Sequence, residues 1–135
     1  MEKNPVIIQF DGEENYHTVV DLICYNMQLE IRRHISNVNQ ARTLFADIES
    51  GKLKPDIAII SSFLEKKHTD GSAVAKKLRE VSPDTKIIAY TVIEDEDWHD
   101  ELAVKSGRNP EKNLIEVLTR LTGKDFNFSN APTQE

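Results

Sequence analysis

Short apolar runs alternate with longer amphipathic segments along the chain. The run at 6–10 is rich in β-branched and aromatic residues and predicts a buried strand. The run at 57–60 is continuously apolar and of strand length, which is typical of a strand buried on both faces of a parallel sheet. The run at 86–90 predicts another strand. Residues 29–35 alternate apolar with polar side chains, as a half-exposed strand at a sheet edge does. The pattern therefore predicts at least four strands.

Between these runs, apolar residues recur every three or four positions, which predicts helices with one buried face. The first begins near Tyr16, with Asn15 as its N-cap, and the second follows Ser36 or Asn37 and stops at Gly51. A further helix is predicted over 70–81. Another is predicted over 94–106, with Trp98 and Leu102 on one face and Gly107 as its end. The last runs from Asn109-Pro110 to Gly123.

Alternating strands and helices predict an open parallel sheet with helices on both faces, a doubly wound α/β architecture. The 135 residues are enough for one domain, which we place at 1–123. Residues 124–135 are polar except for Phe126 and Phe128, and we expect them to form a mobile tail. A strand added to the sheet by residues 126–128 is the alternative for this segment.

Charge and composition exclude some classes of binding partner and activity. A net charge of −6 disfavours nucleic acid, whose binding depends on cations, and the sequence contains no apolar run of membrane-spanning length. The single Cys24 predicts no internal disulfide, and the first residues do not resemble a secretory signal, so a cytoplasmic location is expected. Neither Ser61-Ser62 nor Cys24 has the sequence context of a catalytic nucleophile, and we expect no enzyme activity.

Four local features carry a resemblance to a known family. Pro55-Asp56 precedes the third strand, Asp70-Gly71 opens the third helix, residues 82–85 form a Ser-Pro-Asp-Thr turn, and residues 86–88 lead into a strand that ends in Thr91. In these features residues 55–91 resemble the middle of response-regulator receiver domains, the phospho-acceptor modules of two-component signalling. The resemblance implies a flavodoxin-like or CheY-like sheet of order 2-1-3-4. Because Gly107 lies so close to Pro110, the fifth strand is expected to be missing or remodelled.

The resemblance also places the positions at which receivers are phosphorylated. Receivers carry a pair of acidic residues after the first strand, which helps to hold Mg²⁺. Here this pair falls on Phe10 and Asp11, with Glu13 and Glu14 nearby as a residual acidic pocket. Asp11 therefore implies at most a weak Mg²⁺ site, and we expect no cofactor. The acceptor position falls on Ser61. A hydroxyl cannot form an acyl phosphate and cannot replace a carboxylate as a ligand of Mg²⁺.

Two further receiver positions can be compared. The hydroxyl after the fourth strand is kept as Thr91. Receivers also carry a Lys-Pro pair after the fifth strand. In this sequence that position falls on Asn109-Pro110, with Arg108 as the nearest cation. The chain therefore looks like a degenerate receiver, or pseudo-receiver, that keeps the scaffold and lacks aspartyl phosphorylation.

A pseudo-receiver implies a signalling module that acts through a protein partner. We expect Trp98 and Leu102 to form the partner surface, and the partner to be a histidine kinase, another signalling protein or a second copy of the chain. Two alternatives stay open. One is a phosphorelay response regulator with a displaced acceptor, and the other is a small-ligand-binding flavodoxin-like domain with its site at the carboxyl ends of the strands.

Overall fold

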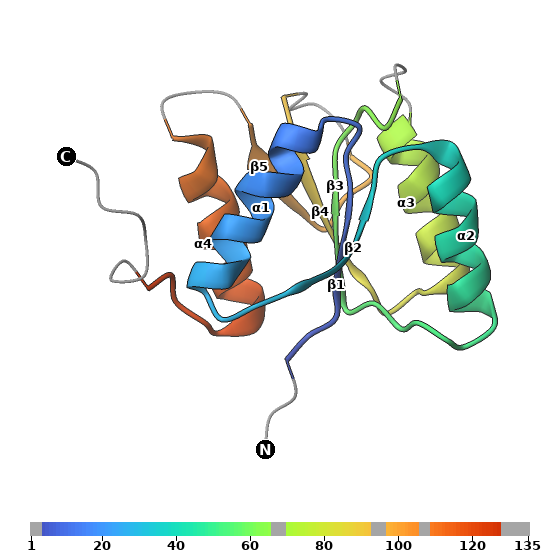
Figure 1. The fold of residues 1–135 in the computed structure, drawn as a ribbon, viewed down its shortest axis with the longest axis horizontal. Coiled ribbons are helices and arrows are strands. Elements are labelled where there is room, and N and C mark those ends of the chain that lie inside the picture. Colours follow the sequence, from blue (N-terminus) through green and yellow to red (C-terminus); the bar gives the residue numbers. More distant parts are fainter. Residues whose placement is uncertain (1–3, 66–69, 93–96, 106–108, 128–135) are drawn as a thin grey trace.

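A five-stranded parallel sheet in the order β2-β1-β3-β4-β5 forms the centre of the molecule (Figure 1). The computed structural model describes residues 4–65, 70–92, 97–105 and 109–127. The strands are β1 (Ile7–Phe10), β2 (Ile31–Ile35), β3 (Ile57–Ile60), β4 (Lys86–Thr91) and β5 (Glu101–Val104). The helices are α1 (Glu14–Asn26), α2 (Val38–Glu49), α3 (Asp70–Val81) and α4 (Pro110–Thr122).

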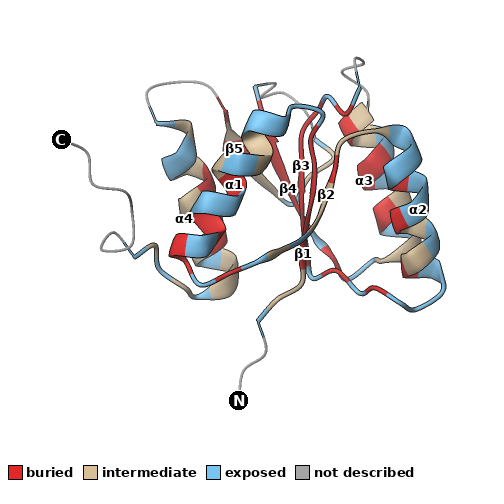
Figure 2. Cartoon of the chain, viewed as in Figure 1, coloured by how far each residue is buried: buried red, intermediate tan, exposed pale blue. Residues whose placement is uncertain are grey.

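Helices cover both faces of this sheet, with α1 and α4 on one face and α2 and α3 on the other (Figure 1). Because side chains alternate along a strand, Ile57 and Ile59 pack toward α1 and α4, whereas Ala58 and Ile60 pack toward α2 and α3. Figure 2 shows the central strands buried between the two helical layers. The doubly wound α/β prediction is confirmed, and so is the position of β2 at a sheet edge.

Side chains at the helix ends explain why the helices begin where they do. Asn37, one of the two caps that the sequence offers, caps α2 by accepting a hydrogen bond from the Gln40 N–H at 2.9 Å. Asn109 caps α4, and Gly123 ends that helix with a φ of 73°. The prediction of Asn15 as a cap is wrong: α1 begins at Glu14, after a turn in which the Glu13 N–H donates to Asp11 Oδ1 at 3.0 Å.

The fifth strand corrects the sequence-based prediction. Residues 101–104 form β5 and pair in parallel with residues 88–91 of β4, so they do not belong to a helix and the strand is not missing. Asp100 begins the pairing, because its N–H donates to the Ile87 carbonyl at 2.9 Å and its Oδ2 accepts from the Ile87 N–H at 2.8 Å. Trp98 and Leu102 therefore do not share a helix face. Gly107 and Arg108 lie outside the described residues.

The start of the predicted tail contacts the body of the domain. Phe126 packs against the core between the sheet and helices α1 and α4, and the Asn127 N–H donates to the Asn26 carbonyl at 2.7 Å. Residues 124–127 do not form a strand, and Phe128 with the remainder of the predicted tail lies outside the described residues. No helix in the described part of the chain has the length and apolar character to cross a membrane.

Candidate functional site at the carboxyl ends of the strands

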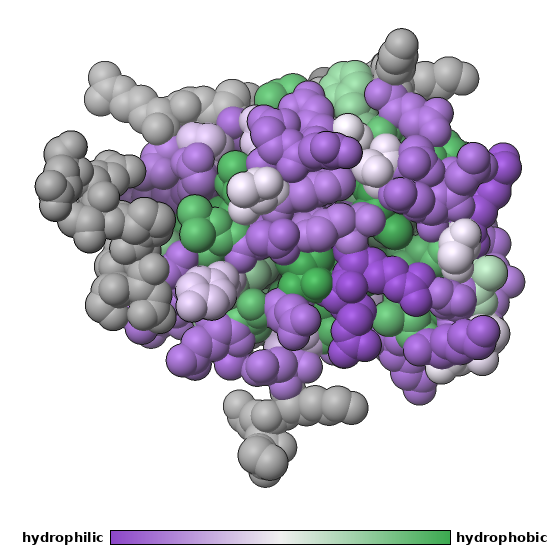
Figure 3. Space-filling view, in the orientation of Figure 1, coloured by the Kyte–Doolittle hydropathy of each residue, from purple (hydrophilic) through white to green (hydrophobic). Residues whose placement is uncertain are grey.

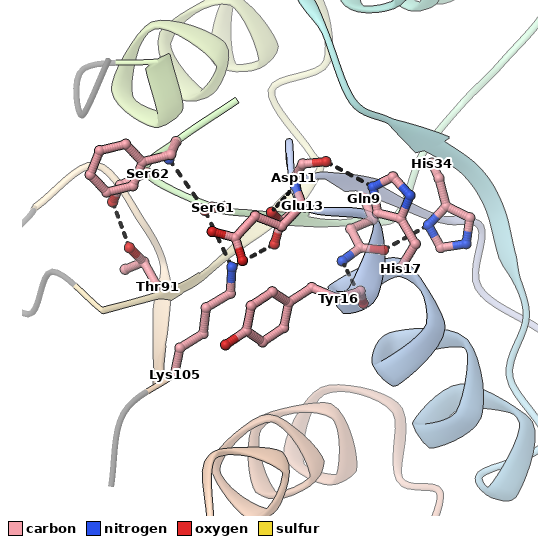
Figure 4. Close-up of polar contacts among 11 residues, drawn as sticks. Gln9, Asp11, Glu13, Tyr16, His17, His34, Ser61, Ser62, Thr91 and Lys105 are labelled. Atoms are coloured by element: carbon pink, nitrogen blue, oxygen red, sulfur yellow. Dashed lines mark hydrogen bonds and ion pairs between the residues drawn. The ribbon is translucent and has the colours of Figure 1, made fainter. Parts of the chain in front are cut away.

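Four polar side chains meet where four different strands end. Asp11 follows β1, Ser61 follows β3, Thr91 is the last residue of β4, and Lys105 follows β5. In a parallel sheet all the carboxyl ends lie at the same edge, so residues up to 94 positions apart in the sequence come together there (Figure 4). This edge is where open α/β sheets commonly place their functional residues.

An ion pair between Lys105 and Asp11 forms the centre of the site. Lys105 Nζ lies 2.5 Å from Asp11 Oδ2, and the two side chains are 5% and 2% exposed. The same nitrogen lies 3.4 Å from Ser61 Oγ and 3.9 Å from the centre of the Tyr16 ring. The ammonium group is therefore surrounded by a carboxylate, a hydroxyl and an aromatic face, all of which favour a positive charge.

Asp11 is held by contacts on all of its polar groups. Its Oδ1 accepts the Glu13 N–H at 3.0 Å, its backbone carbonyl contacts His17 Nε2 at 2.7 Å, and its own N–H donates to the Ile35 carbonyl at 2.9 Å. Both carboxylate oxygens therefore have protein partners. A metal ion at Asp11 would have to compete with Lys105 for Oδ2.

The two serine hydroxyls at the end of β3 have different partners. Ser61 Oγ accepts the Phe63 N–H at 3.2 Å and faces Lys105, whereas Ser62 Oγ accepts from Thr91 Oγ1 at 2.8 Å. Both serines and Thr91 are buried. The structure thus places Ser61 in contact with Lys105, whereas Thr91 bonds to Ser62 and lines the same small cavity.

Little space and few ligands remain for a metal or a cofactor. Glu13 and Glu14 are exposed at the start of α1, and in the described part of the chain no three His, Cys, Asp or Glu residues are grouped as metal ligands would be. A cavity of about 70 Å³ lies beside Ser61, lined also by Glu13, Tyr16 and Lys105. Sites for organic ligands measure roughly 300–1,000 Å³. This cavity holds a few water molecules at most.

Two tyrosine rings, those of Tyr16 and Tyr90, lie beside Lys105 on the face of the sheet that α1 and α4 cover. Burial raises the pKa of Tyr16 above its ordinary value of 10.0, and Glu13 and Asp11 raise this pKa further. Burial likewise raises the pKa of Tyr90, whose ring meets that of Tyr16 edge-on at 5.9 Å between centres. Both phenols therefore stay neutral at neutral pH, so they add no charge beside the ion pair.

A chain of hydrogen bonds leads from the site toward the surface along β1 and β2 (Figure 4). Gln9 is fully buried; its Nε2 donates to the Tyr16 carbonyl at 3.3 Å and its Oε1 lies 2.7 Å from His34 Nδ1. His34 Nε2 contacts Asp21 Oδ1 at 2.8 Å, and the rings of His17 and His34 stack 4.7 Å apart. These two histidines have structural roles, while His68 lies outside the described residues.

Lys105 is the site residue that the sequence analysis missed. The expected Lys-Pro equivalent, Asn109-Pro110, is instead the N-cap and first turn of α4, so it does not supply the cation of the site. The available signal was the position of Lys105 in the sequence. Lys105 directly follows the Glu-Leu-Ala-Val run of residues 101–104, so it lies at the carboxyl end of that run. Using it required recognising residues 101–104 as a strand.

Trp98 and Leu102, the expected partner surface, are both half-buried. Trp98 packs against the core on the side of α2 and α3, and its carbonyl accepts a hydrogen bond from Arg79 at 3.2 Å. Leu102 lies on β5, at the edge of the sheet. The two residues therefore contribute to the region around β5 through different elements, and their role in partner binding stays a prediction.

Comparison with known proteins supports the fold. No protein-family model matches the chain, and no curated protein matches it. Among solved structures, a signal receiver domain of an HD domain-containing protein from Pseudomonas fluorescens Pf-5 superposes with a TM-score of 0.69 at 16% identity, over 87% of this chain and 94% of that one. A response regulator from Thermotoga maritima gives 0.68 at 16% identity, over 88% and 98%.

A third neighbour was solved as a complex. It is the response regulator TrrA from Thermotoga maritima in complex with Mg²⁺ and BeF, which superposes with a TM-score of 0.66 at 20% identity, over 88% of this chain and 99% of that one. The chain therefore has the fold of receiver domains. At these identities the likeness establishes the fold, and the chemistry of the site has to be argued from this chain's own residues.

Proposed function

We propose that this chain is a receiver-fold signalling module that acts by binding another protein and is not phosphorylated on an aspartate. The observation that carries the proposal is the closed ion pair of Lys105 and Asp11 beside Ser61. The receiver fold supports the signalling role, since the structural neighbours are response regulators.

Charge balance at the site supports the absence of aspartyl phosphorylation. One carboxylate faces one ammonium, both nearly fully buried, so the pair is neutral without a metal ion. Phosphorylation at Ser61 would give a stable ester in place of an acyl phosphate, and the Ser61 hydroxyl already contacts Phe63 and Lys105. The position that the resemblance assigns to the phospho-acceptor therefore carries a hydroxyl in place of a carboxylate.

The two alternatives have less support. For a displaced acceptor, Asp11 is already paired with Lys105. Of the other candidate carboxylates, Glu13 and Glu14 are exposed, and Asp70 Oδ2 accepts the Leu64 and Glu65 N–H groups at 3.3 and 2.9 Å. For an organic ligand beside Ser61, the cavity of about 70 Å³ is too small.

We place the protein-binding surface at β5. This strand is at the edge of the sheet, and such strands can pair with another chain through their free backbone groups. Leu102 and Val104 are half-buried on it, and Val92, at the end of β4, is 54% exposed. The partner is a cytoplasmic signalling protein such as a histidine kinase, or a second copy of this chain.

The decisive experiment is a titration with Mg²⁺ and beryllofluoride, followed by the fluorescence of Trp98 and by the melting temperature. The proposal predicts no saturable change in either signal, and no phosphorylated protein by intact mass after incubation with acetyl phosphate. A saturable response that the Asp11→Asn variant abolishes would instead establish the displaced-acceptor alternative. Sedimentation of the wild type and of Leu102→Lys then tests whether a second copy occupies β5.

A further inference from the structure

A second hollow lies at the opposite end of the sheet from Asp11 and Lys105. It measures about 750 Å³ and is formed by the N-terminal segment before β1, the loop between α2 and β3, the start of β4 and the end of α4. Figure 1 shows these segments together at the lower side of the molecule, where the strands begin. The hollow shares no residue with the candidate site described above.

Four cationic side chains line this hollow. They are Arg32, Lys52, Lys54 and Lys86, all exposed, and none of them forms an ion pair within the described ranges. Among the described residues of the lining, Asp56 is the one carboxylate, and its Oδ2 already accepts the Val6 N–H at 2.7 Å. In a chain of net charge −6, such a local excess of positive charge is a specific feature of this surface.

Some cations elsewhere on the described surface form ion pairs. Arg33, the neighbour of Arg32 on β2, pairs with Asp47 at 2.6 Å, and Arg79 pairs with Asp100 at 3.3 Å. Figure 3 shows that hydrophilic side chains cover much of the face that it presents, with apolar patches between them. Arg42, Lys76 and Lys112 are also exposed and form no ion pair within the described ranges, so the hollow is distinguished by the gathering of four cations around one concave lining.

The ends of the helices do not account for this arrangement. Cations in the last turn of a helix offset its dipole, but α2 has no basic residue in its last turn. Arg32 and Lys86 lie on strands β2 and β4, not at helix ends. Bringing four like charges to one hollow costs free energy that a bound anion would offset.

The size and lining of the hollow indicate what kind of anion fits. Its volume falls within the roughly 300–1,000 Å³ of small-molecule sites. Leu53, Ile57 and Leu121 supply apolar surface for an organic portion, while the guanidinium of Arg32 suits the oxygens of a phosphate. A concave pocket of this size fits a compact ligand better than an extended acidic peptide.

We propose that this hollow binds a small organic phosphate with two or more negative charges, held by Arg32, Lys52, Lys54 and Lys86. The proposal goes beyond the signalling role and does not depend on it. It gives the chain a ligand input at the end of the sheet away from Ser61.

The test is calorimetric titration of the full chain, without Mg²⁺, with three probes: adenosine 5′-triphosphate, inorganic pyrophosphate and a hexaglutamate peptide. The double variant Lys54→Gln with Lys86→Gln removes two cations of the hollow. Lys76→Gln with Lys112→Gln is the matched control, since it removes two exposed lysines that do not line the hollow. Circular dichroism melting verifies that both variants stay folded.

The proposal predicts saturable binding of adenosine 5′-triphosphate that weakens by roughly tenfold or more in the first variant and stays within about twofold in the control. Absence of binding at millimolar concentration, or equal weakening in both variants, would overturn it. Binding of pyrophosphate alone would reduce the hollow to an inorganic-anion site. Tighter binding of the peptide would assign it to an acidic protein, and both of these results also overturn the proposal.

Discussion

Lys105 and Asp11 are 94 positions apart in the sequence, and their side chains, both nearly fully buried, meet at 2.5 Å. Removing one partner leaves the other charge buried without compensation. We expect Lys105→Met to lower the free energy of unfolding by about 3–5 kcal/mol. Urea unfolding measures this loss, with Lys77→Met as control, because the Lys77–Glu49 pair is about half exposed and should contribute less than about 1 kcal/mol.

The double variant Asp11→Asn with Lys105→Met completes this thermodynamic cycle. Since neither charge then remains buried, its loss of stability should be clearly smaller than the sum of the two single losses. Simple additivity of the two substitutions would contradict the description of the two groups as one coupled pair.

A carboxylate at position 61 should create a metal site. In Ser61→Asp two carboxylates would face Lys105, which gives Mg²⁺ a second oxygen ligand. We expect millimolar Mg²⁺ to raise the melting temperature of Ser61→Asp and to leave that of the wild type unchanged. Adding Asp11→Asn to Ser61→Asp should remove the effect. Equal stabilisation of the wild type would show that Ser61 is not what prevents metal binding.

Alkaline pH should destabilise the fold through Cys24. Burial raises the pKa of this thiol from 9.0 to about 12. Above pH 9 the unfolded chain releases the proton while the native chain keeps it, so stability is lost as the pH rises from 9 to 12, by up to about 1.4 kcal/mol per pH unit. Tyr90, whose pKa burial also raises, adds to the loss above pH 10.

The contribution of the thiol is separable. Unfolding free energies of the wild type and Cys24→Ala, measured from pH 8 upward, should show a shallower decline in the variant, which retains the contributions of Tyr16 and Tyr90. Parallel curves for the two proteins would contradict a native thiol with a raised pKa.

The start of α3 packs too closely on the end of β3 to accept any side chain at position 71. A Cβ at Gly71 would lie 2.6 Å from the Ser61 carbonyl oxygen and 2.8 Å from Ser62 Cα. Helix propensity alone favours alanine by about 1 kcal/mol, so the two effects have opposite signs. We expect Gly71→Ala to be destabilising in thermal unfolding, and a stabilised variant would disprove the close approach.

The sequence predicts most of the fold because its central strands are unambiguous. Residues 57–60 are apolar throughout and are buried on both faces, and Asn37 and Asn109 mark helix starts with their own side chains. The strand β5 is different. It has four residues with only one β-branched member, and Trp98 and Leu102 stand four positions apart, as on a helix. The pairing with β4 that makes it a strand is a tertiary effect, which local pattern does not contain.

The site was predictable in part for the same reason. Asp11, Ser61 and Thr91 follow from recognising the strands that carry them, and they do meet at one edge. Lys105 depends on β5, and its pairing with Asp11 spans 94 residues, so no local spacing encodes it. Pro110 matches the proline of the Lys-Pro pair, which led the sequence analysis to place the cation position at Asn109. In the structure Asn109 is instead the N-cap of α4.

The buried amide of Gln9 has a consequence for how the sheet assembles. The strand β2 contains only Ile31 and Ile35 as apolar residues, so hydrophobic burial alone discriminates poorly between alternative alignments with β1. Sliding β2 by one residue would separate His34 from Gln9 and leave the Gln9 Oε1 without its partner in the core. The hydrogen bond between these two side chains therefore acts as a register lock, which selects one alignment of an edge strand that its apolar content leaves ambiguous.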